Sequence, residues 1–229
     1  MSKSSQTAID QIDESLLYIT ELLHRVSNEY TGAISFASRL AGKSENVETK
    51  NSLHEIINYL HALAAAHHIL RPPLGNELVD LSENITRLCR AMALAGLEKR
   101  GIRVHLALTE SIVLDASRCW HASLIVAELI SNASRHASLA RGGCVCVSIE
   151  AALGRIVCRV SDNGSACTTF RPGVGSLVVN TLAEEIDGCI ERRFGNCGTT
   201  ITLSFPSEAA SIAARSDFRS PASVSRELR

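Results

Sequence analysis

One ten-residue segment of the chain carries four side chains of the kinds that bind phosphates and metal ions. The segment ELISNASRHA places a carboxylate at Glu128, a carboxamide at Asn132 and basic groups at Arg135 and His136, within an otherwise apolar run. Offsets of four, seven and eight residues put these groups on one face of a helix. Because hard cations prefer oxygen donors, Asn132 is a candidate ligand for a Mg²⁺ ion held between phosphates. For this segment alone, a helix with a solvated polar edge is the alternative.

A second polar group stands at the end of an expected strand. Residues 155–164, RIVCRVSDNG, alternate apolar and polar side chains as a strand does, and they end with Asp162 and Gly164. A carboxylate there can accept a hydrogen bond from an exocyclic amine such as that of adenine, and a glycine lets the backbone approach a flat ring. Asp-Asn-Gly is also a common turn, so this pattern alone leaves both interpretations open.

Two glycines precede a helical pattern further along the chain. Gly173 and Gly175 open the segment GVGSLVVNTLAEEIDG. Free backbone amides and the helix dipole at such a start favour phosphate oxygens. Residues 189–206 then have the pattern of a β-hairpin, whose last strand begins at Gly198 and Thr199. Each signal is weak by itself, and their fixed order gives them weight.

The order of these segments resembles the ATP-binding domain of sensor histidine kinases, over roughly residues 80 to 206. ELISNASRHA is similar to the N box of this family, SDNG to its first glycine box, GVGSLVV to its second, and GTTITLSFP to its closing strand. The resemblance implies an α/β sandwich that binds ATP and Mg²⁺ between its helices and a mixed sheet.

The resemblance also implies a role for each matching residue. Asn132 ligates Mg²⁺, Asp162 binds the adenine amino group, and Thr199 lies near the base. Glu128 is the candidate general base. The remaining candidates contact the phosphates or shape the nucleotide lid and the phosphate cradle: Arg135, His136, Gly164, Gly173 and Gly175.

The chain departs from the family pattern around its first glycine box. Ala166 stands where many members have a second glycine, the stretch between Gly164 and Gly173 is short, and no Trp-x-Glu motif lies nearby. We expect Ala166 to stiffen the start of the lid. Because of these departures, a domain of this fold that no longer binds ATP remains an alternative.

The N-terminal part of the chain has a different periodicity. Apolar residues recur at alternating spacings of three and four over residues 9–30, continuing loosely to Ala37 and Leu40. After a polar loop at 42–48, the same pattern returns over residues 53–70. Pro72 and Pro73 then end the second helix. Each helix of such a hairpin carries an apolar stripe that a second hairpin would cover. We therefore expect a homodimer built around a four-helix bundle.

His24 lies one position beyond the stripe residue Leu23 and is expected to face outward. A neutral imidazole nitrogen is nucleophilic near pH 7, so an exposed histidine is a candidate phosphoacceptor. The string HRVSN resembles the phosphoacceptor box of the atypical histidine kinases that read His-Arg-x-x-Asn, a subgroup allied to the HWE kinases. This resemblance makes His24 the phosphorylated residue, with Arg25 and Asn28 completing the box. His67 is expected to be packed inside the hairpin or at the dimer interface.

Composition agrees with this interpretation. The 229 residues, 45% of them hydrophobic, suffice for one or two domains with a sizeable core. A net charge of -1 argues against nonspecific nucleic-acid binding. There is no secretory signal, and no apolar run approaches the roughly 20 residues that span a bilayer. We expect a cytoplasmic protein without membrane insertion, with reduced thiols, in which Cys144, Cys146 and Cys158 are small buried side chains.

The expected fold is α+β with three parts. Residues 1–72 form the dimerisation and phosphoacceptor hairpin, residues 78–206 the α/β-sandwich ATP-binding domain, and residues 207–229 a disordered tail. Asp80 or Ser82 is expected to cap the first helix of the second part.

Two functions remain open at this point. One is a two-component histidine kinase that autophosphorylates His24 from Mg-ATP and passes the phosphoryl group to an aspartate of a response-regulator receiver domain. The other is a histidine phosphotransferase of the same fold, whose nucleotide domain is degenerate and which relays phosphate between receivers. The retained Asn132 and Asp162 favour the kinase. Because the apolar stripe begins within the first ten residues, we expect no sensor domain ahead of it. Input is then expected from another protein, from the dimer itself, or not at all.

Overall fold

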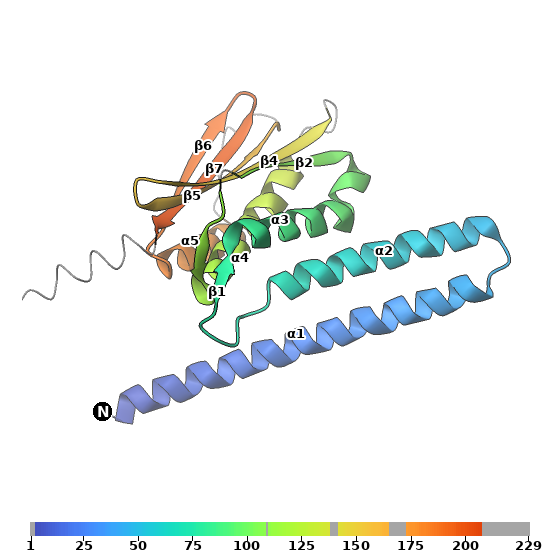
Figure 1. The fold of residues 1–229 in the computed structure, drawn as a ribbon, viewed down its shortest axis with the longest axis horizontal. Helices are drawn as coiled ribbons and strands as arrows, with labels where there is room; N and C mark the ends of the chain where they lie inside the picture. The colour runs from blue at the N-terminus through green and yellow to red at the C-terminus, as the bar shows by residue number, and fades with distance from the viewer. Residues whose placement is uncertain (1–2, 109, 138–141, 165–172, 208–229) are drawn as a thin grey trace, which may run out of the picture.

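The molecule consists of a long helical hairpin and a layered domain of sheet and helices (Figure 1). The computed structural model describes residues 3–108, 110–137, 142–164 and 173–207, and in the first helix it describes side chains from residue 21 onward. The predicted 207–229 tail lies, beyond Ser207, outside the described residues, as does the lid segment 165–172 with Ala166. The predicted α+β order of a helical hairpin followed by an α/β domain is confirmed.

The hairpin joins α1 (Lys3–Lys43) to α2 (Val47–Ile69) through a short loop. The side chain of Asn46 caps α2 by accepting a hydrogen bond from the Thr49 amide at 3.0 Å. The ring of Tyr30 on α1 contacts that of His67 on α2, with centroids 5.4 Å apart. His67 is thus a packed residue, as predicted.

The layered domain follows the hairpin without interruption. Its helical elements are α3 (Leu81–Met92), a π-helical turn (Ala93–Leu97), a 3-10 turn (Glu98–Arg100), α4 (Ala116–His136) and α5 (Val174–Glu184). Its strands are β1 (Leu78–Asp80), β2 (Ile102–Leu108), β3 (Val113–Asp115), β4 (Gly143–Ala152), β5 (Arg155–Asp162), β6 (Cys189–Gly195) and β7 (Gly198–Pro206).

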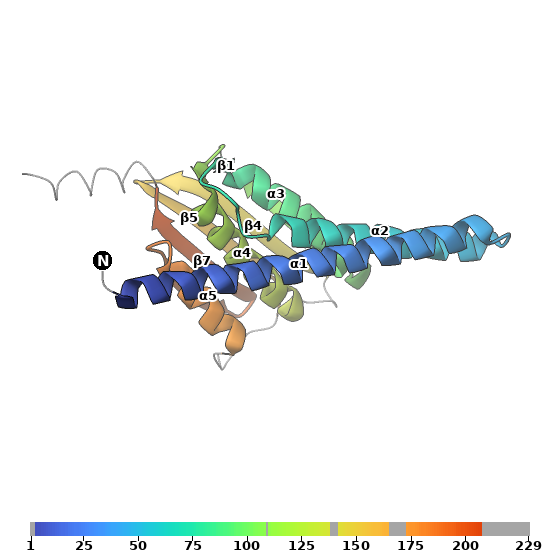
Figure 2. The same cartoon turned by 90° about the horizontal axis from the view of Figure 1, so that it is seen from below.

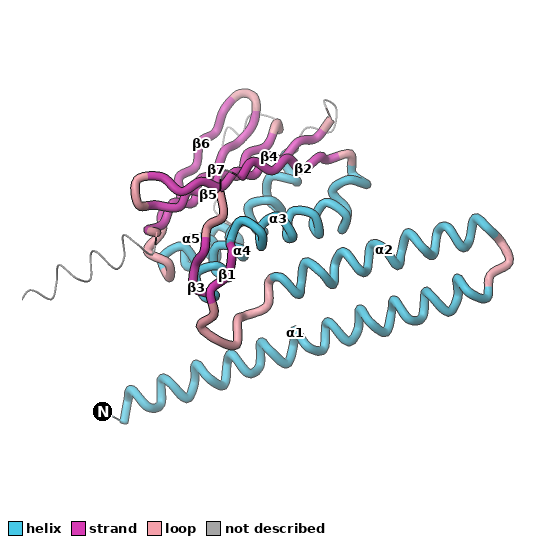
Figure 3. The backbone as a smooth tube through the Cα atoms, viewed as in Figure 1, coloured by secondary structure: helices cyan, strands magenta, loops and turns pink. Residues whose placement is uncertain are grey.

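The main sheet has the strand order β2-β4-β5-β7-β6 (Figure 3). β2 runs parallel to β4, and every other neighbouring pair is antiparallel, so the sheet is mixed as expected. Strands β1 and β3 form a separate two-stranded ribbon. Helices α3, α4 and α5 cover one face of the main sheet, and the hairpin lies on the far side of these helices (Figures 1 and 2).

The core lies between the sheet and the covering helices. Side chains such as Ile85, Ile125 and Phe205 are fully buried there. Burial of this kind stabilises a domain by roughly 1.5 to 3 kcal/mol for each large apolar side chain. The apolar side chains of this core therefore fix the positions of α4 and α5 relative to the sheet.

The prediction that all three strand cysteines are buried is wrong for two of them. Along β4 it is Val145 and Val147 that face the helices, whereas Cys144 is half-buried and Cys146 is exposed on the opposite face. Cys158 is buried as expected, and burial raises the pKa of its thiol to about 12. Successive strand residues point to opposite faces, and periodicity alone did not tell which face of β4 is covered.

The helix starts follow the expected chemistry. The Asp80 carboxylate accepts hydrogen bonds from the amides of Ser82 and Glu83, so Asp80 rather than Ser82 caps α3. Asp115 caps α4 in the same way, accepting from the Arg118 amide at 2.9 Å. None of the described helices combines the length and the apolar character that crossing a bilayer requires.

Candidate functional site

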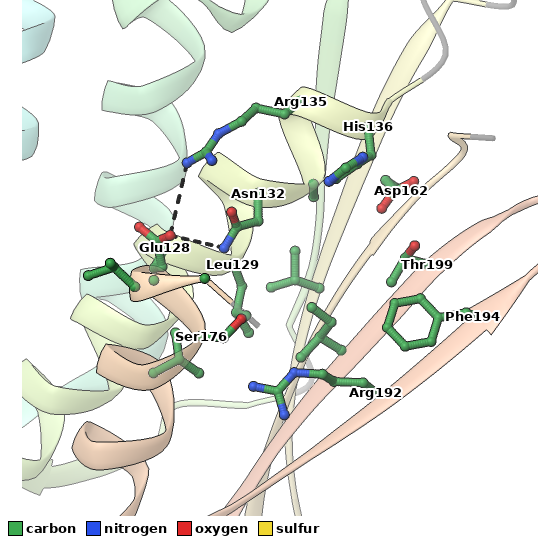
Figure 4. A pocket seen from close by; sticks show the side chains of 17 residues that line it. Glu128, Leu129, Asn132, Arg135, His136, Asp162, Ser176, Arg192, Phe194 and Thr199 are labelled. Carbon is green, nitrogen blue, oxygen red and sulfur yellow. Dashed lines mark hydrogen bonds and ion pairs between the residues drawn. The ribbon is translucent and has the colours of Figure 1, made fainter. Parts of the chain in front are cut away.

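A cavity of about 600 Å³ opens between α4 and α5 on one side and strands β5, β6 and β7 on the other (Figure 4). Nine site residues were predicted for the nucleotide domain, and eight of them line this cavity: Glu128, Asn132, Arg135, His136, Asp162, Gly173, Gly175 and Thr199. Segments that are distant in sequence therefore meet at one place. Gly164, the ninth, lies buried next to the cavity.

A polar network runs along the face of α4 that lines the cavity. The Asn132 Nδ2 donates a hydrogen bond to Glu128 Oε1 at 3.0 Å, and the guanidinium of Arg135 lies 4.0 Å from the same oxygen. Arg135 also donates to the hydroxyl of Ser131. The first hydrogen bond fixes the carboxamide with its nitrogen toward Glu128 and its Oδ1 turned away. Glu128, Asn132 and Arg135 of the predicted polar stripe thus contact one another, while Arg135 and His136 keep exposed side chains at the edge of the cavity.

Asp162 ends β5 at the cavity wall, where its carboxylate accepts a hydrogen bond from the Gly164 amide at 2.7 Å. A Cβ atom at Gly164 would lie 2.0 Å from the carbonyl oxygen of His136. At Gly198, where φ is +133°, a Cβ atom would lie 1.8 Å from the carbonyl oxygen of Asp162. Two glycines therefore let neighbouring backbone segments approach closely around Asp162.

The two glycines before α5 have different surroundings. Gly173 is the N-cap residue of α5, and its carbonyl oxygen accepts a hydrogen bond from the Ser176 amide. A Cβ atom at Gly173 would meet nothing within 4 Å. A Cβ atom at Gly175 would lie 2.3 Å from Glu128 Oε1. A side chain at position 175 would therefore displace the Glu128 carboxylate. Gly173 leaves open space at the start of the helix, where backbone amides favour anions.

Among the cavity residues that sequence reasoning missed are Arg192 and Phe194 on β6. In the β6–β7 register, Arg192 pairs with Ile201 and Phe194 with Thr199. Paired residues share a face of the sheet, so the assignment of Thr199 to the site was the signal that could have identified both. Arg192 donates to the Asn180 side chain at 2.8 Å, and partial burial lowers the pKa of its guanidinium.

The donor set of the cavity fits a nucleotide carried with a magnesium ion. Among the described residues there is no cluster of three or more His, Cys, Asp or Glu side chains able to hold a metal by themselves. Mg²⁺ commonly takes one or two protein oxygens and completes its shell with phosphate oxygens and water. A single carboxamide oxygen at Asn132 suits that mode, while apolar Val160 and Ile201 suit a flat ring.

His24 lies on α1 with an exposed side chain, as predicted. Its Nδ1 is 3.1 Å from the carboxamide nitrogen of Asn28, one helical turn later. Arg25 forms an ion pair with Glu21 at 3.0 Å. The residues that line the cavity all come from the layered domain, and His24 is not one of them. The structure therefore brings the nucleotide-domain candidates together and leaves the histidine on the separate hairpin.

Two consecutive linker residues tie the hairpin to the layered domain. The guanidinium of Arg71 donates to Ser27 Oγ at 2.9 Å and to the carbonyl of Leu23 at 3.3 Å, on either side of His24. The indole of Trp120 on α4 donates to the carbonyl of Leu70 at 3.0 Å. Leu70 and Arg71 thus link the part of α1 that carries His24 to helix α4 of the layered domain.

Two family models match the chain at these two regions. A histidine kinase model matches residues 21–95, which include His24 and the hairpin. The model of histidine kinase-, DNA gyrase B- and HSP90-like ATPases matches residues 121–209, which include the cavity. Together the matched segments cover more than half of the chain.

Curated relatives agree with the family models. The sensor histidine kinase PdtaS of Mycobacterium tuberculosis is 27% identical over 197 residues, covering 82% of this chain and 39% of the relative. PdtaS of Mycolicibacterium smegmatis is 26% identical over 213 residues, with 87% and 42% covered. The chain thus spans about two fifths of the length of these relatives.

Solved structures share the fold. The histidine kinase domain of the blue-light activated histidine kinase EL346 from Erythrobacter litoralis has a TM-score of 0.53 at 16% identity, over 77% of this chain and 96% of that one. The Acinetobacter baumannii histidine kinase AdeS has a TM-score of 0.50 at 19% identity, over 82% and 98%. With an exposed histidine on a helical hairpin, a cavity of the ATPase type and both family models, the chain belongs to the histidine kinases.

Proposed function

We propose that the chain is a two-component histidine kinase that autophosphorylates His24 from Mg²⁺-ATP and passes the phosphoryl group to an aspartate of a receiver domain. The observation that carries this proposal is the cavity, in which Asn132, Asp162 and the start of α5 converge from separate elements. A protein that only relays phosphate has no need of a cavity with these three features. The receiver aspartate is the partner chemistry that the family implies.

The residues of the cavity divide the work of nucleotide binding. The Asp162 carboxylate accepts the hydrogen bond of the adenine amino group, and Phe194 and Ile201 contribute apolar surface for the ring. The amides at the start of α5 face the phosphates, together with Arg135 and His136. Asn132 Oδ1 would hold Mg²⁺, which neutralises phosphate charge when bound.

The nucleophile is the imidazole of His24, whose reactivity depends on its tautomer. With the Asn28 Nδ2 donating to Nδ1, the ring carries its proton on Nε2. Rotation of the carboxamide presents its oxygen instead, which accepts from a protonated Nδ1 and leaves the Nε2 lone pair free to attack phosphorus. Because a carboxamide has both a donor and an acceptor, Asn28 can serve either tautomer. Glu128 is the carboxylate available in the cavity to take up a proton.

The hairpin supplies the dimer interface in this proposal. Leu22, Phe36 and Leu40 are exposed on one face of α1. A second hairpin covers this face in a four-helix bundle. Because His24 does not line the cavity of its own domain, phosphoryl transfer requires the hairpin and a nucleotide domain to come together, within one subunit or across the dimer.

Nucleotide binding is the first test. Calorimetry of the purified chain with ATP, with and without Mg²⁺, should give binding that Mg²⁺ strengthens. Asn132→Ala should remove the Mg²⁺ dependence, whereas Asn51→Ala on exposed α2 should leave it unchanged. If millimolar nucleotide does not bind to the wild-type chain, the kinase proposal fails and the relay function of a histidine phosphotransferase takes its place.

Labelling from radioactive ATP is the second test. His24→Ala should abolish acid-labile phosphate incorporation while leaving ATP affinity unchanged, because His24 lies outside the cavity. His54→Ala, which removes another exposed histidine of the hairpin, should retain full labelling. Undiminished labelling of His24→Ala would assign the phosphoacceptor to a different residue.

A further inference from the structure

Two cysteines lie side by side on the open face of the main sheet. Cys144 and Cys146 are two positions apart on β4, and their sulfur atoms are 3.6 Å apart. Both point away from the helical layer, with Cys144 half-buried and Cys146 exposed. Arg103 and His105 of β2 stand opposite them in the parallel register. The pair is thus accessible to solvent, and Cys146 is the more exposed of the two.

The backbone of this pair is connected to the nucleotide site. The Cys144 amide donates to the side chain of Asn163 at 2.9 Å, and the Asn163 amide donates to the Cys144 carbonyl at 3.3 Å. Val145, between the two cysteines, pairs with Asp162 in the β4–β5 register. A local change of β4 at this point therefore acts directly on Asp162 and Asn163.

We propose that Cys144 and Cys146 form a reversible redox site, whose oxidation to a disulfide by a low-molecular-weight disulfide weakens nucleotide binding at Asp162. One cysteine thiolate attacks the oxidant, forms a mixed disulfide and releases one thiol. The second thiolate then attacks the cysteine sulfur of the mixed disulfide, so that the intrachain S–S bond forms and the second thiol leaves. The protein loses two electrons and two protons, and the oxidant is reduced to two thiols.

The geometry of a strand predicts the mechanical effect of this bond. An extended strand rises about 3.3 Å per residue, so Cα atoms two positions apart are separated by about 6.6 Å. Disulfides usually join Cα atoms between about 4.4 and 6.8 Å apart, most often near the middle of that range. The bond therefore draws β4 together at Val145, opposite Asp162. Strained, exposed disulfides are also the ones that thiols reduce most easily, which makes the change reversible.

The remaining described cysteines lack this arrangement. Cys89, Cys119 and Cys158 are buried in the core. Cys189 and Cys197 are exposed, but neither has a sulfur contact of the kind seen on β4 among the described residues. Partial burial and the neighbouring Cys144 raise the pKa of Cys146, so proximity to a second thiol, rather than an unusually acidic thiol, distinguishes the pair.

The test uses the full chain with Cys167, Cys189 and Cys197 replaced by serine, so that Cys144 and Cys146 are the accessible thiols. After incubation with oxidised glutathione, intact mass should be lower by two hydrogen atoms, and a thiol reductant should restore it. In the same background, Cys144→Ser should instead gain one glutathione at Cys146. A doubly glutathionylated chain without the intrachain bond overturns the redox site.

The coupling to the nucleotide site rests on the proposed function and has its own measurement. Calorimetry should show ATP affinity about fivefold or more lower for the oxidised form than for the reduced form, a typical coupling between sites. Equal affinities overturn the coupling. If the reduced chain binds no ATP, the proposed function has failed, and the coupling is read from hydrogen exchange instead. The amides of Asn163 and Gly164 should then exchange faster after oxidation, and unchanged exchange overturns it.

Discussion

The layered domain and the hairpin bury their apolar side chains in different ways. In the layered domain, large residues such as Ile85 and Phe205 are fully buried between sheet and helices. In the described part of the hairpin, every buried residue is an alanine. Meanwhile Leu22, Phe36 and Leu40 are 60%, 57% and 41% exposed on one face of α1. The domain completes its own core, whereas the hairpin leaves apolar area uncovered.

This difference shows which part of the function each region can perform alone. The nucleotide cavity is shaped by close contacts within one core, such as those of Gly164 and Gly175, so it needs no second chain. The hairpin positions its histidine on a helix that lacks a complete core. We therefore expect substitutions in the domain to change folding stability, and substitutions on the exposed hairpin face to change assembly.

The largest effect is expected on assembly. Phe36→Asp places a charge on the exposed apolar face of α1, and burying two such charges in a symmetric dimer costs several kcal/mol. Dimer affinity should fall about 1,000-fold, which corresponds to about 4 kcal/mol. Sedimentation or light scattering should detect monomers. Ser35→Asp, an exposed change about 100° around α1 from Phe36, should keep the dimer. Unchanged mass for Phe36→Asp would exclude this face as the interface.

The next largest effect is expected on folding stability, at Gly164 and Gly173, which both belong to the predicted glycine boxes. Gly164→Ala forces a Cβ atom against the carbonyl of His136, and such overpacking costs about 1 to 3 kcal/mol. Gly173→Ala meets open space and should cost only the poorer N-cap preference of alanine, about 0.5 to 1 kcal/mol. Urea unfolding measures both variants. Equal destabilisation would contradict the packing described around Asp162.

A smaller effect is expected at the cap of α3. The hydrogen bond from Ser111, followed by those from backbone amides, holds the pKa of Asp80 below its usual value. A lowered pKa adds stability above the unfolded-state pKa, and this stability is lost as the pH falls below about 4. Asp80→Ala should cost about 1 kcal/mol at neutral pH through loss of the cap.

Asp80→Asn is the matched control for this pH effect. A carboxamide still accepts from the amides of Ser82 and Glu83, so the cap is retained, but it does not titrate. Its unfolding free energy should therefore change less between pH 7 and pH 3 than that of the wild-type chain. Parallel pH profiles for the two proteins would exclude Asp80 as a source of acid sensitivity.

The smallest effect is expected where the two regions meet at the surface. Lys99 of the layered domain pairs with Glu55 of α2 at 3.2 Å, and both side chains are largely exposed. Surface ion pairs contribute about 0 to 1 kcal/mol and are screened by salt. Lys99→Ala should lower the unfolding free energy by less than about 0.5 kcal/mol, with no difference in molar salt. A cost above 1 kcal/mol would reveal a stronger bond between the regions than these contacts indicate.

In the hairpin, periodicity predicted an apolar face of α1 but not which face is buried against α2. The predicted stripe through Leu23 and Tyr30 is half-buried, and Tyr30 contacts His67 of α2, so this stripe packs within the hairpin. The stripe was expected to continue loosely to Ala37 and Leu40; Ala37 is buried, but Leu40 lies with Phe36 on an exposed face that was not predicted. A long helix can carry two apolar faces, and spacing does not tell which one its own partner helix covers.

Spacing along the chain by itself determined the elements and their local chemistry. It identified the polar face of α4 at Glu128 and Asn132, the strand that ends at Asp162, the capped start of α3 and the outward position of His24. These properties follow from the fixed periods of helix and strand and from the hydrogen-bonding needs of helix ends.

Only the tertiary structure decided which of these residues share a space and which face of the sheet is covered. The pairing of β6 with β7 brought Arg192 and Phe194 into the cavity, and the placement of the helices left Cys144 and Cys146 on the open side. Strand periodicity defines two faces without ranking them. Burial of one face depends on contacts between segments far apart in sequence, which no local pattern contains.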